Sequence, residues 1–169
     1  MESKSYSFPA LPNNAEELLA LPGVSFQDPF AVAALAVCAF NRFPESPDDC
    51  FAMVDALKGP QPLSGMDKAF IKDRFMDGKD YVPRSYFKGA VPDNDYTPDE
   101  PFTIAVKESV HSRDQFSQGY ITLYLKSGGA DSERPVTLRH KPSTDEWFLW
   151  NHVGILADIR PPKSSDPWA

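Results

Sequence analysis

Four side chains that could recognise a ligand lie in three neighbouring segments of the C-terminal half: Tyr124, Arg139, Phe148 and Trp150. A guanidinium group can pair with a carboxylate, and aromatic rings can stack on a flat ligand or seat a peptide. Aromatic residues and threonine are also ordinary members of a half-exposed sheet, where they stabilise one another across strands. The residue types therefore fit a recognition surface and also a purely structural face.

The segments that carry these residues show the two-residue period of β-strands. Apolar and polar positions alternate in "PFTIAVKES", "GYITLYLKSG", "RPVTLRHK" and "EWFLWNHV", and "PSTD" between the last two is a turn. A last short strand, "GILADIR", is expected to close the sheet. Strands that follow one another in this way predict an antiparallel meander.

The turns give an estimate of the register. A symmetric turn at "KPSTDE" pairs His140 with Trp147, Leu138 with Leu149, and Val136 with Asn151, and the loop "SGGADSER" pairs Leu123 with Leu138 and Leu125 with Val136. Alternation then predicts an apolar face of Phe102, Ile104, Val106, Ile121, Leu123, Leu125, Val136, Leu138 and Leu149. The opposite face is predicted to carry Lys107, Tyr120, Thr122, Tyr124, Thr137, Arg139, Phe148 and Trp150.

Three capped helices precede the strands. They are "DPFAVAALAVCAFNRF", which is apolar on every face and so predicted to be buried, "SPDDCFAMVDALKGP" and "SGMDKAFIKDRFMDG". The predicted fold is α+β: an N-terminal three-helix layer on a four- to five-stranded antiparallel sheet, with a Pro-rich ordered arm. We expect residues 1–27 to form an N-terminal arm with one helical turn, residues 28–162 a single domain, and residues 163–169 a tail.

The Pro-rich arm covers residues 79–101. Tyr81, Tyr86, Phe87 and Tyr96 are too many aromatic residues for a solvated linker. We expect the arm to be ordered and to pack against the helices or over the aromatic face, with Tyr86 and Tyr96 edging the recognition surface.

The net charge is −7 and the pI is about 4.9, and the basic residues are dispersed along the sequence. Both features argue against nucleic acids and anionic membranes as partners. Neither a signal-peptide pattern nor an apolar run long enough to span a bilayer occurs, so a cytoplasmic location is predicted. Cys38 and Cys50 lie in apolar helical contexts and are expected to be buried thiols.

Catalytic and metal-binding patterns are weak, so no catalytic residue, metal or cofactor is predicted. "KSGGADS" joins two strands and opens no helix, and it therefore lacks the context of a phosphate-binding loop. His111, His140 and His152 have no metal-ligand spacing, and alternation places His140 on the helix face and His152 on the other face. "DNDYTPDE" lacks the glycine and the terminal glutamate of a calcium loop.

Two long motifs resemble those of a known family. The segments "SYFKGAVPDNDYTP" and "GADSERPVTLR", followed by "WFLW", resemble a family of uncharacterised small Firmicutes proteins, a domain of unknown function, with an SYFxGAxPxNxYTP arm and a GADSxRPVxLR hairpin. The resemblance covers about residues 30–162. It implies no activity, and it implies that the arm and the aromatic hairpin belong to one structural unit.

These features favour a non-enzymatic binding or interaction module for a protein or small-molecule partner, with its oligomeric state open. The alternative is a small ligand-binding protein or enzyme with the cone shape of nuclear transport factors, in which His140 and Asn151 would face a pocket between helices and sheet. A third possibility, an acidic decoy or immunity-like protein, rests on charge alone.

Overall fold

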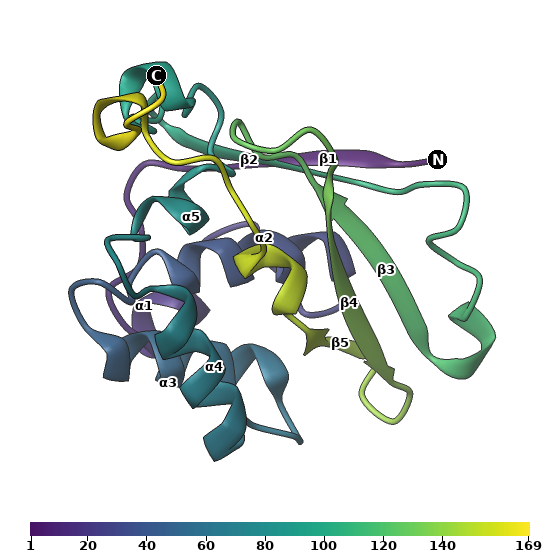
Figure 1. Cartoon of the computed structure of the whole chain (residues 1–169). Coiled ribbons are helices and arrows are strands. Elements are labelled where there is room, and N and C mark those ends of the chain that lie inside the picture. The colour runs from purple at the N-terminus through teal and green to yellow at the C-terminus, as the bar shows by residue number, and fades with distance from the viewer.

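Five strands form one antiparallel sheet in this computed structural model, which describes residues 1–169 (Figure 1). All neighbouring strands are antiparallel, so the predicted α+β class with an antiparallel sheet is confirmed. In spatial order the strands are β1 (Ser3–Phe8), β2 (Phe102–Lys107), β3 (Tyr120–Leu125), β4 (Arg134–Lys141) and β5 (Glu146–Asn151).

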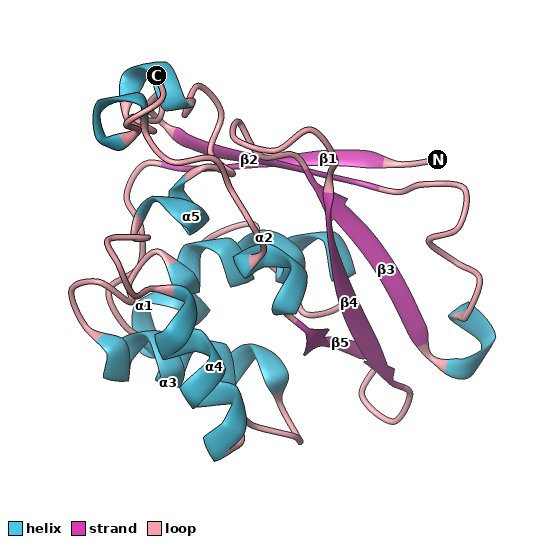
Figure 2. Cartoon of the chain, in the orientation of Figure 1, coloured by secondary structure: helices cyan, strands magenta, loops and turns pink.

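Helices lie on one side of the sheet (Figure 2). They are α1 (Ala15–Leu19), α2 (Pro29–Phe40), α3 (Pro47–Lys58), α4 (Gly65–Arg74) and α5 (Tyr81–Arg84). Four single turns of 3-10 helix complete the chain: η1 (Pro92–Asn94), η2 (Phe116–Gln118), η3 (Val153–Leu156) and η4 (Lys163–Ser165). None of the helices has the length and hydrophobicity needed to cross a bilayer.

The helix starts follow from side-chain caps. Asp28 accepts a hydrogen bond from the Phe30 N–H at 3.0 Å, and Ser46 accepts one from the Asp49 N–H at 3.2 Å. Ser64 and Asp67 form a reciprocal capping box at the start of α4. Each cap satisfies a backbone donor that the first turn of a helix leaves free, which is why the helices begin where the sequence predicts.

The core lies between α2 and the sheet. Every side chain of α2 from Phe30 to Phe40 is buried, and the helix contacts all five strands as well as α3. A cluster of 38 buried residues fills this space, so the region between helices and sheet is occupied by side chains. Cys38 and Cys50 are buried free thiols within it, as expected.

The predicted register is correct for two of the three pairs in the β4–β5 hairpin and is shifted in the β3–β4 hairpin. His140 faces Trp147 and Leu138 faces Leu149, but a bulge between Thr137 and Leu138 places Thr137, not Val136, opposite Asn151. In the β3–β4 hairpin the partners of Leu138 and Val136 are Ile121 and Leu123, a shift of two residues.

A shift of two residues leaves the face assignment intact, because side chains alternate with a period of two. Of the nine apolar residues predicted to face the helices, all but the half-buried Phe102 are fully buried. The residues predicted for the other face are half-buried or exposed.

The fifth strand comes from the N-terminus, not the C-terminus. Residues 154–160 were predicted to form a strand, but the chain leaves the sheet after Asn151, whose Oδ1 accepts the Val153 N–H and starts η3. Residues 3–8 instead pair with β2 as β1. Lys4, Tyr6 and Phe8 point inward there, and the serines between them point outward. The side chains therefore alternate as in any strand, but the inward positions are less hydrophobic than those of the other strands.

The Pro-rich segment 79–101 packs into the core and holds the C-terminal chain. Tyr81 and Tyr96 stack with ring centroids 5.4 Å apart, and Tyr96 is fully buried. The Tyr86 hydroxyl donates to the Ile155 carbonyl at 2.7 Å, and the Tyr96 hydroxyl donates to the Arg160 carbonyl. The aromatic residues of this segment therefore form a latch between the core and residues 155–160.

The same segment is joined to the β3–β4 loop. The Gly128 N–H donates to the Ser85 carbonyl at 2.9 Å, and the Ser127 hydroxyl donates to the Ser85 hydroxyl at 2.7 Å. A Cβ on Gly129 would meet the Tyr96 hydroxyl oxygen at 1.9 Å, so only glycine fits there. Arm and hairpin thus form one structural unit.

Candidate functional site

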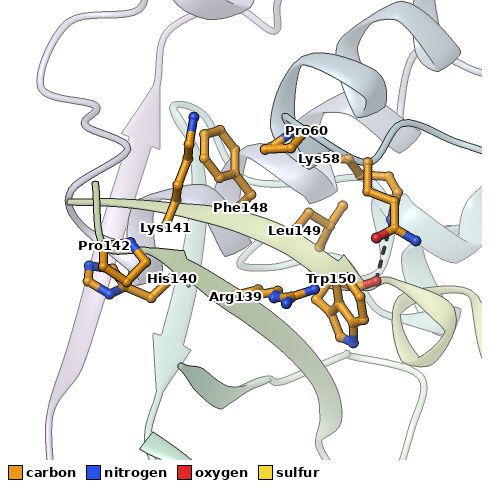
Figure 3. Close-up of a pocket in the computed structure, with 10 residues that line it drawn as sticks. Lys58, Pro60, Arg139, His140, Lys141, Pro142, Phe148, Leu149 and Trp150 are labelled. Atoms are coloured by element: carbon orange, nitrogen blue, oxygen red, sulfur yellow. Dashed lines mark hydrogen bonds between the residues drawn. The ribbon is translucent and has the colours of Figure 1, made fainter. Parts of the chain in front are cut away.

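A pocket of about 330 Å³ lies at the β5 edge of the sheet, where the end of α3 meets the outer face (Figure 3). We call it the edge pocket. Its volume is at the lower end of the range for small-molecule sites. Its lining residues come from the α3–α4 connection and from β4 and β5: Lys58, Pro60, Gln61, Arg139, His140, Lys141, Pro142, Phe148, Leu149 and Trp150.

The α3–α4 connection reaches this edge because α3 ends at Gly59. Gly59 has a φ of +61°, a conformation that favours glycine, and a Cβ there would lie 2.4 Å from the Phe148 ring. Lys58 then donates a hydrogen bond of 3.4 Å to the Trp150 carbonyl. On the same strand the Trp147 N–H donates to the Phe26 carbonyl at 2.7 Å. These contacts cover an edge strand that would otherwise expose its backbone groups.

Arg139 is held by aromatic rings on the outer face. Its guanidinium carbon lies 4.6 Å from the centre of the Trp150 ring and 5.5 Å from that of Tyr120, and Figure 3 shows the side chain extending toward Trp150. The two rings meet edge to face at 5.7 Å. A guanidinium that rests on rings keeps its N–H donors available in the plane of the group.

The edge pocket is positively charged in an acidic protein. Its lining includes three cationic side chains, Lys58, Arg139 and Lys141, and no aspartate or glutamate. None of the three is among the ion pairs of the structure. Cations without counter-ions beside aromatic walls form an arrangement that an organic anion would complement.

Two buried polar groups are incompletely satisfied, Lys58 in the lining of the edge pocket and His152, whose pKa the charge of Lys58 affects. Lys58 is 7% exposed, and its one hydrogen bond is the long contact with Trp150. His152 is 3% exposed, packs near the rings of Phe40 and Phe70, and has no hydrogen-bond partner for either ring nitrogen.

Burial disfavours the charged form of both groups. Burial lowers the pKa of the Lys58 ammonium, and Asp67 and Asp55 offset this in part. Burial and then the charge of Lys58 lower the pKa of His152 to about 4, against a smaller opposing effect of Asp67. His152 is therefore a neutral imidazole at neutral pH.

The structure separates the six residues predicted to form the recognition surface. Arg139, Phe148 and Trp150 come together at the edge pocket. Tyr124 lies on the same face, but it is four residues beyond Tyr120 on β3 and does not line the pocket. Tyr86 and Tyr96 are buried in the latch and do not edge this surface.

The two residues predicted to face a pocket between helices and sheet, His140 and Asn151, do not come together in such a pocket. His140 lines the edge pocket, where its ring packs 4.7 Å from that of Trp147 and its Nε2 lies 2.9 Å from Asp145. Asn151 is exposed, and its Oδ1 accepts the Val153 N–H at 3.0 Å. His152 was predicted to face away from the helices but is buried among them, because strand alternation stops once the chain turns into η3.

Sequence reasoning missed Lys58, Gln61 and Lys141 as pocket residues. A sequence signal exists for one of them: Lys58 directly precedes the helix stop Gly59-Pro60, so the backbone must turn sharply there. Nothing in the sequence indicates that this turn reaches β5.

A second hollow, of about 730 Å³, lies between the outer face of β1 and β2 and residues 85–91. Its charged side chains, Lys88 and Lys126, are both exposed, and its other lining residues are serine, threonine, glycine and five hydrophobic residues. It is larger but has no buried charged group and no exposed ring, so the edge pocket is the stronger candidate.

Comparison with known families identifies one family over most of the chain. The chain belongs to a family described as a domain of unknown function, DUF6935, which matches residues 10–163. No curated protein and no solved structure matches the chain.

Proposed function

We propose that this protein is a non-enzymatic binding module whose edge pocket takes a small organic anion with a flat apolar part. The observation that carries the proposal is the set of three cations, Lys58, Arg139 and Lys141, that line a pocket without any acidic residue in a chain of net charge −7. A carboxylate on the ligand would supply the missing counter-charge.

The walls of the pocket favour a ring on the same ligand. Phe148 and Trp150 offer apolar surface, and Trp150 already positions the guanidinium of Arg139. A ligand that places its ring against these side chains and its carboxylate near Arg139 would use both kinds of contact at once.

The rest of the fold would serve as the scaffold of this site. In this proposal the layer formed by α2, α3 and α4 brings Lys58 to the sheet edge, and the Pro-rich arm stabilises the domain without touching the ligand. The protein would act in the cytoplasm on a soluble metabolite-sized anion. The arm and hairpin motifs would be the shared signature of the family among Firmicutes.

Calorimetric titration with p-toluate, a ring that bears one carboxylate, tests the proposal. The neutral p-toluamide is the matched ligand control, and Arg139→Ala is the matched protein variant. We expect p-toluate to bind at least about tenfold more tightly than the amide, because a charge-assisted hydrogen bond contributes about 1.5–3 kcal/mol. Equal binding of acid and amide, or binding unaffected by Arg139→Ala, would exclude the edge pocket as an anion site.

A further inference from the structure

Lys58 differs from every other lysine of the chain in its surroundings. It is the one buried lysine, it lines the edge pocket, and its ammonium has a single hydrogen bond, 3.4 Å long, to the Trp150 carbonyl (Figure 3). No carboxylate lies within ion-pair distance of it. A buried ammonium in such a place is poorly compensated.

The charged groups that act on Lys58 are engaged elsewhere. Asp55 accepts the Leu63 N–H at 2.8 Å, and Asp67 accepts the Ser64 N–H at 2.9 Å within the capping box. The neighbouring His152 is neutral at neutral pH and buried. The neutral amine is therefore more favoured at Lys58 than at an exposed lysine.

We propose that the Lys58 amine condenses with a carbonyl group on an anionic ligand in the edge pocket, so that the protein captures carboxylate-bearing aldehydes or ketones as imines. The inference rests on the proposed function, because the anion site must first hold the ligand. Lys58 Nζ forms a double bond to the carbonyl carbon, and the carbonyl oxygen leaves as water with the two protons of the amine. The step needs neither an oxidant nor a reductant.

The pocket offers the contacts that such a capture requires. Arg139 can hold the carboxylate, while Phe148 and Trp150 can flank the body of the ligand. A lysine that is partly desolvated and next to other cations loses its proton more readily than an exposed one, and lysines that form Schiff bases have such surroundings.

Reductive trapping tests this inference. The protein is incubated with 4-carboxybenzaldehyde and sodium cyanoborohydride near neutral pH, and the modified lysines are mapped and timed by peptide mass spectrometry. We expect the Lys58 adduct to form at least about tenfold faster than that of the exposed Lys126, because the edge pocket holds the aldehyde next to the Lys58 amine. An excess of p-toluate should slow only the pocket reaction, and benzaldehyde, which lacks the carboxylate, should show less selectivity for Lys58.

The Lys58→Arg variant cannot form the imine, so it should lose the fast adduct. Lys88→Arg, in the second hollow and outside the edge pocket, is the matched control and should keep the fast adduct of Lys58. If p-toluate binds but Lys58 reacts no faster than Lys126, the imine inference is wrong and the anion site stands. If Lys58 reacts fast but p-toluate neither binds nor slows the reaction, the proposed function fails, and with it the capture of anionic carbonyls.

Discussion

The latch and the edge pocket both contain aromatic and polar side chains, but they differ in how far these side chains are buried and whether their polar groups have partners. In the latch, Tyr86 and Tyr96 are buried and each hydroxyl donates to a backbone carbonyl of the C-terminal segment. In the edge pocket, Trp150 is half-buried, and Arg139 and Lys141 have no counter-ion. The first region has its polar groups satisfied within the protein, whereas the second offers them to a ligand.

Burial and hydrogen bonding therefore distinguish structural residues from candidate binding residues better than residue type does. Both regions are rich in aromatic residues, and the sequence assigned members of both to one surface. A hydrogen-bonded, buried aromatic residue contributes to the free energy of folding. An unpaired cation beside an open ring contributes little to it and is available for binding. Substitutions in the two regions should therefore change different measured quantities.

The largest effect is expected from Tyr96→Ala in the latch. Emptying a buried aromatic site should lower the free energy of unfolding by about 3–5 kcal/mol, because Tyr96 stacks on Tyr81 and is fully buried. Urea unfolding measures this loss. Tyr96→Phe is the matched variant and should lose only about 1–3 kcal/mol, the cost of leaving the Arg160 carbonyl without its donor. A latch variant that stays folded but binds p-toluate tenfold more weakly would break the proposed division.

Next in size is the pH dependence of stability due to His152. Its pKa is lowered to about 4 in the fold, while an unfolded chain has a value of about 6.5. As the pH falls, His152 is protonated first in the unfolded state. The contribution of neutral His152 to the free energy of unfolding is therefore complete above pH 6.5 and is lost as the pH falls to about 4. The loss is on the order of 3 kcal/mol.

The His152→Leu variant isolates this contribution. Neither ring nitrogen has a partner in the fold, so we expect a change of less than about 1 kcal/mol at pH 7. Urea unfolding between pH 7 and pH 4.5 should show a smaller loss of stability for the variant than for the natural chain. Parallel losses in both proteins would mean that other groups account for the acid sensitivity.

A third prediction concerns Arg139→Ala in the edge pocket. We expect binding of p-toluate to weaken about 10- to 100-fold, the equivalent of one charge-assisted hydrogen bond. The free energy of unfolding should change by less than about 1 kcal/mol, because the side chain is exposed. Lys88→Ala, in the second hollow, is the matched control and should leave p-toluate binding unchanged. Weaker binding in Lys88→Ala alone would move the anion site to the second hollow.

The smallest effect is expected from the outer-face tyrosines. Tyr120 lies next to Arg139 and Trp150, so Tyr120→Ala should weaken p-toluate binding about two- to fivefold through loss of a cation–π contact. Tyr124→Ala should change it less than about twofold, since Tyr124 does not line the pocket. Calorimetry on this pair shows how far the binding surface extends along β3.

Local signals in the sequence account for most of the fold. Asp28, Ser46 and Ser64 cap the helices as predicted, and the apolar alternation sorts β2 to β5 into two faces even where the register is off by two residues. The sequence pattern did not predict β1, because serine occupies its outward positions and Lys4 one of its inward positions. Its pairing with β2 is a contact across about a hundred residues of chain, which no local pattern specifies.

The candidate site could be predicted only in part. Arg139, Phe148 and Trp150 follow from strand alternation, but Lys58 joins them because Gly59, with its positive φ, turns the chain at the β5 edge. Tyr86 and Tyr96 were misplaced because their composition shows that the arm is ordered without showing which surface it covers. The environment that leaves Lys58 poorly compensated depends on tertiary packing alone.

The most direct test of the edge pocket as an anion site uses the three tryptophans as reporters in one experiment. Trp150 lines the edge pocket, Trp147 is buried on the opposite face of β5, and Trp168 is exposed near the C-terminus. Their indole N–H signals are followed by NMR during titration with p-toluate and, as a control, p-toluamide. We predict that the Trp150 signal shifts strongly with the acid, that those of Trp147 and Trp168 shift little, and that the amide has little effect on any of them. A titration in which Trp150 does not respond, or in which acid and amide shift it equally, would contradict the account.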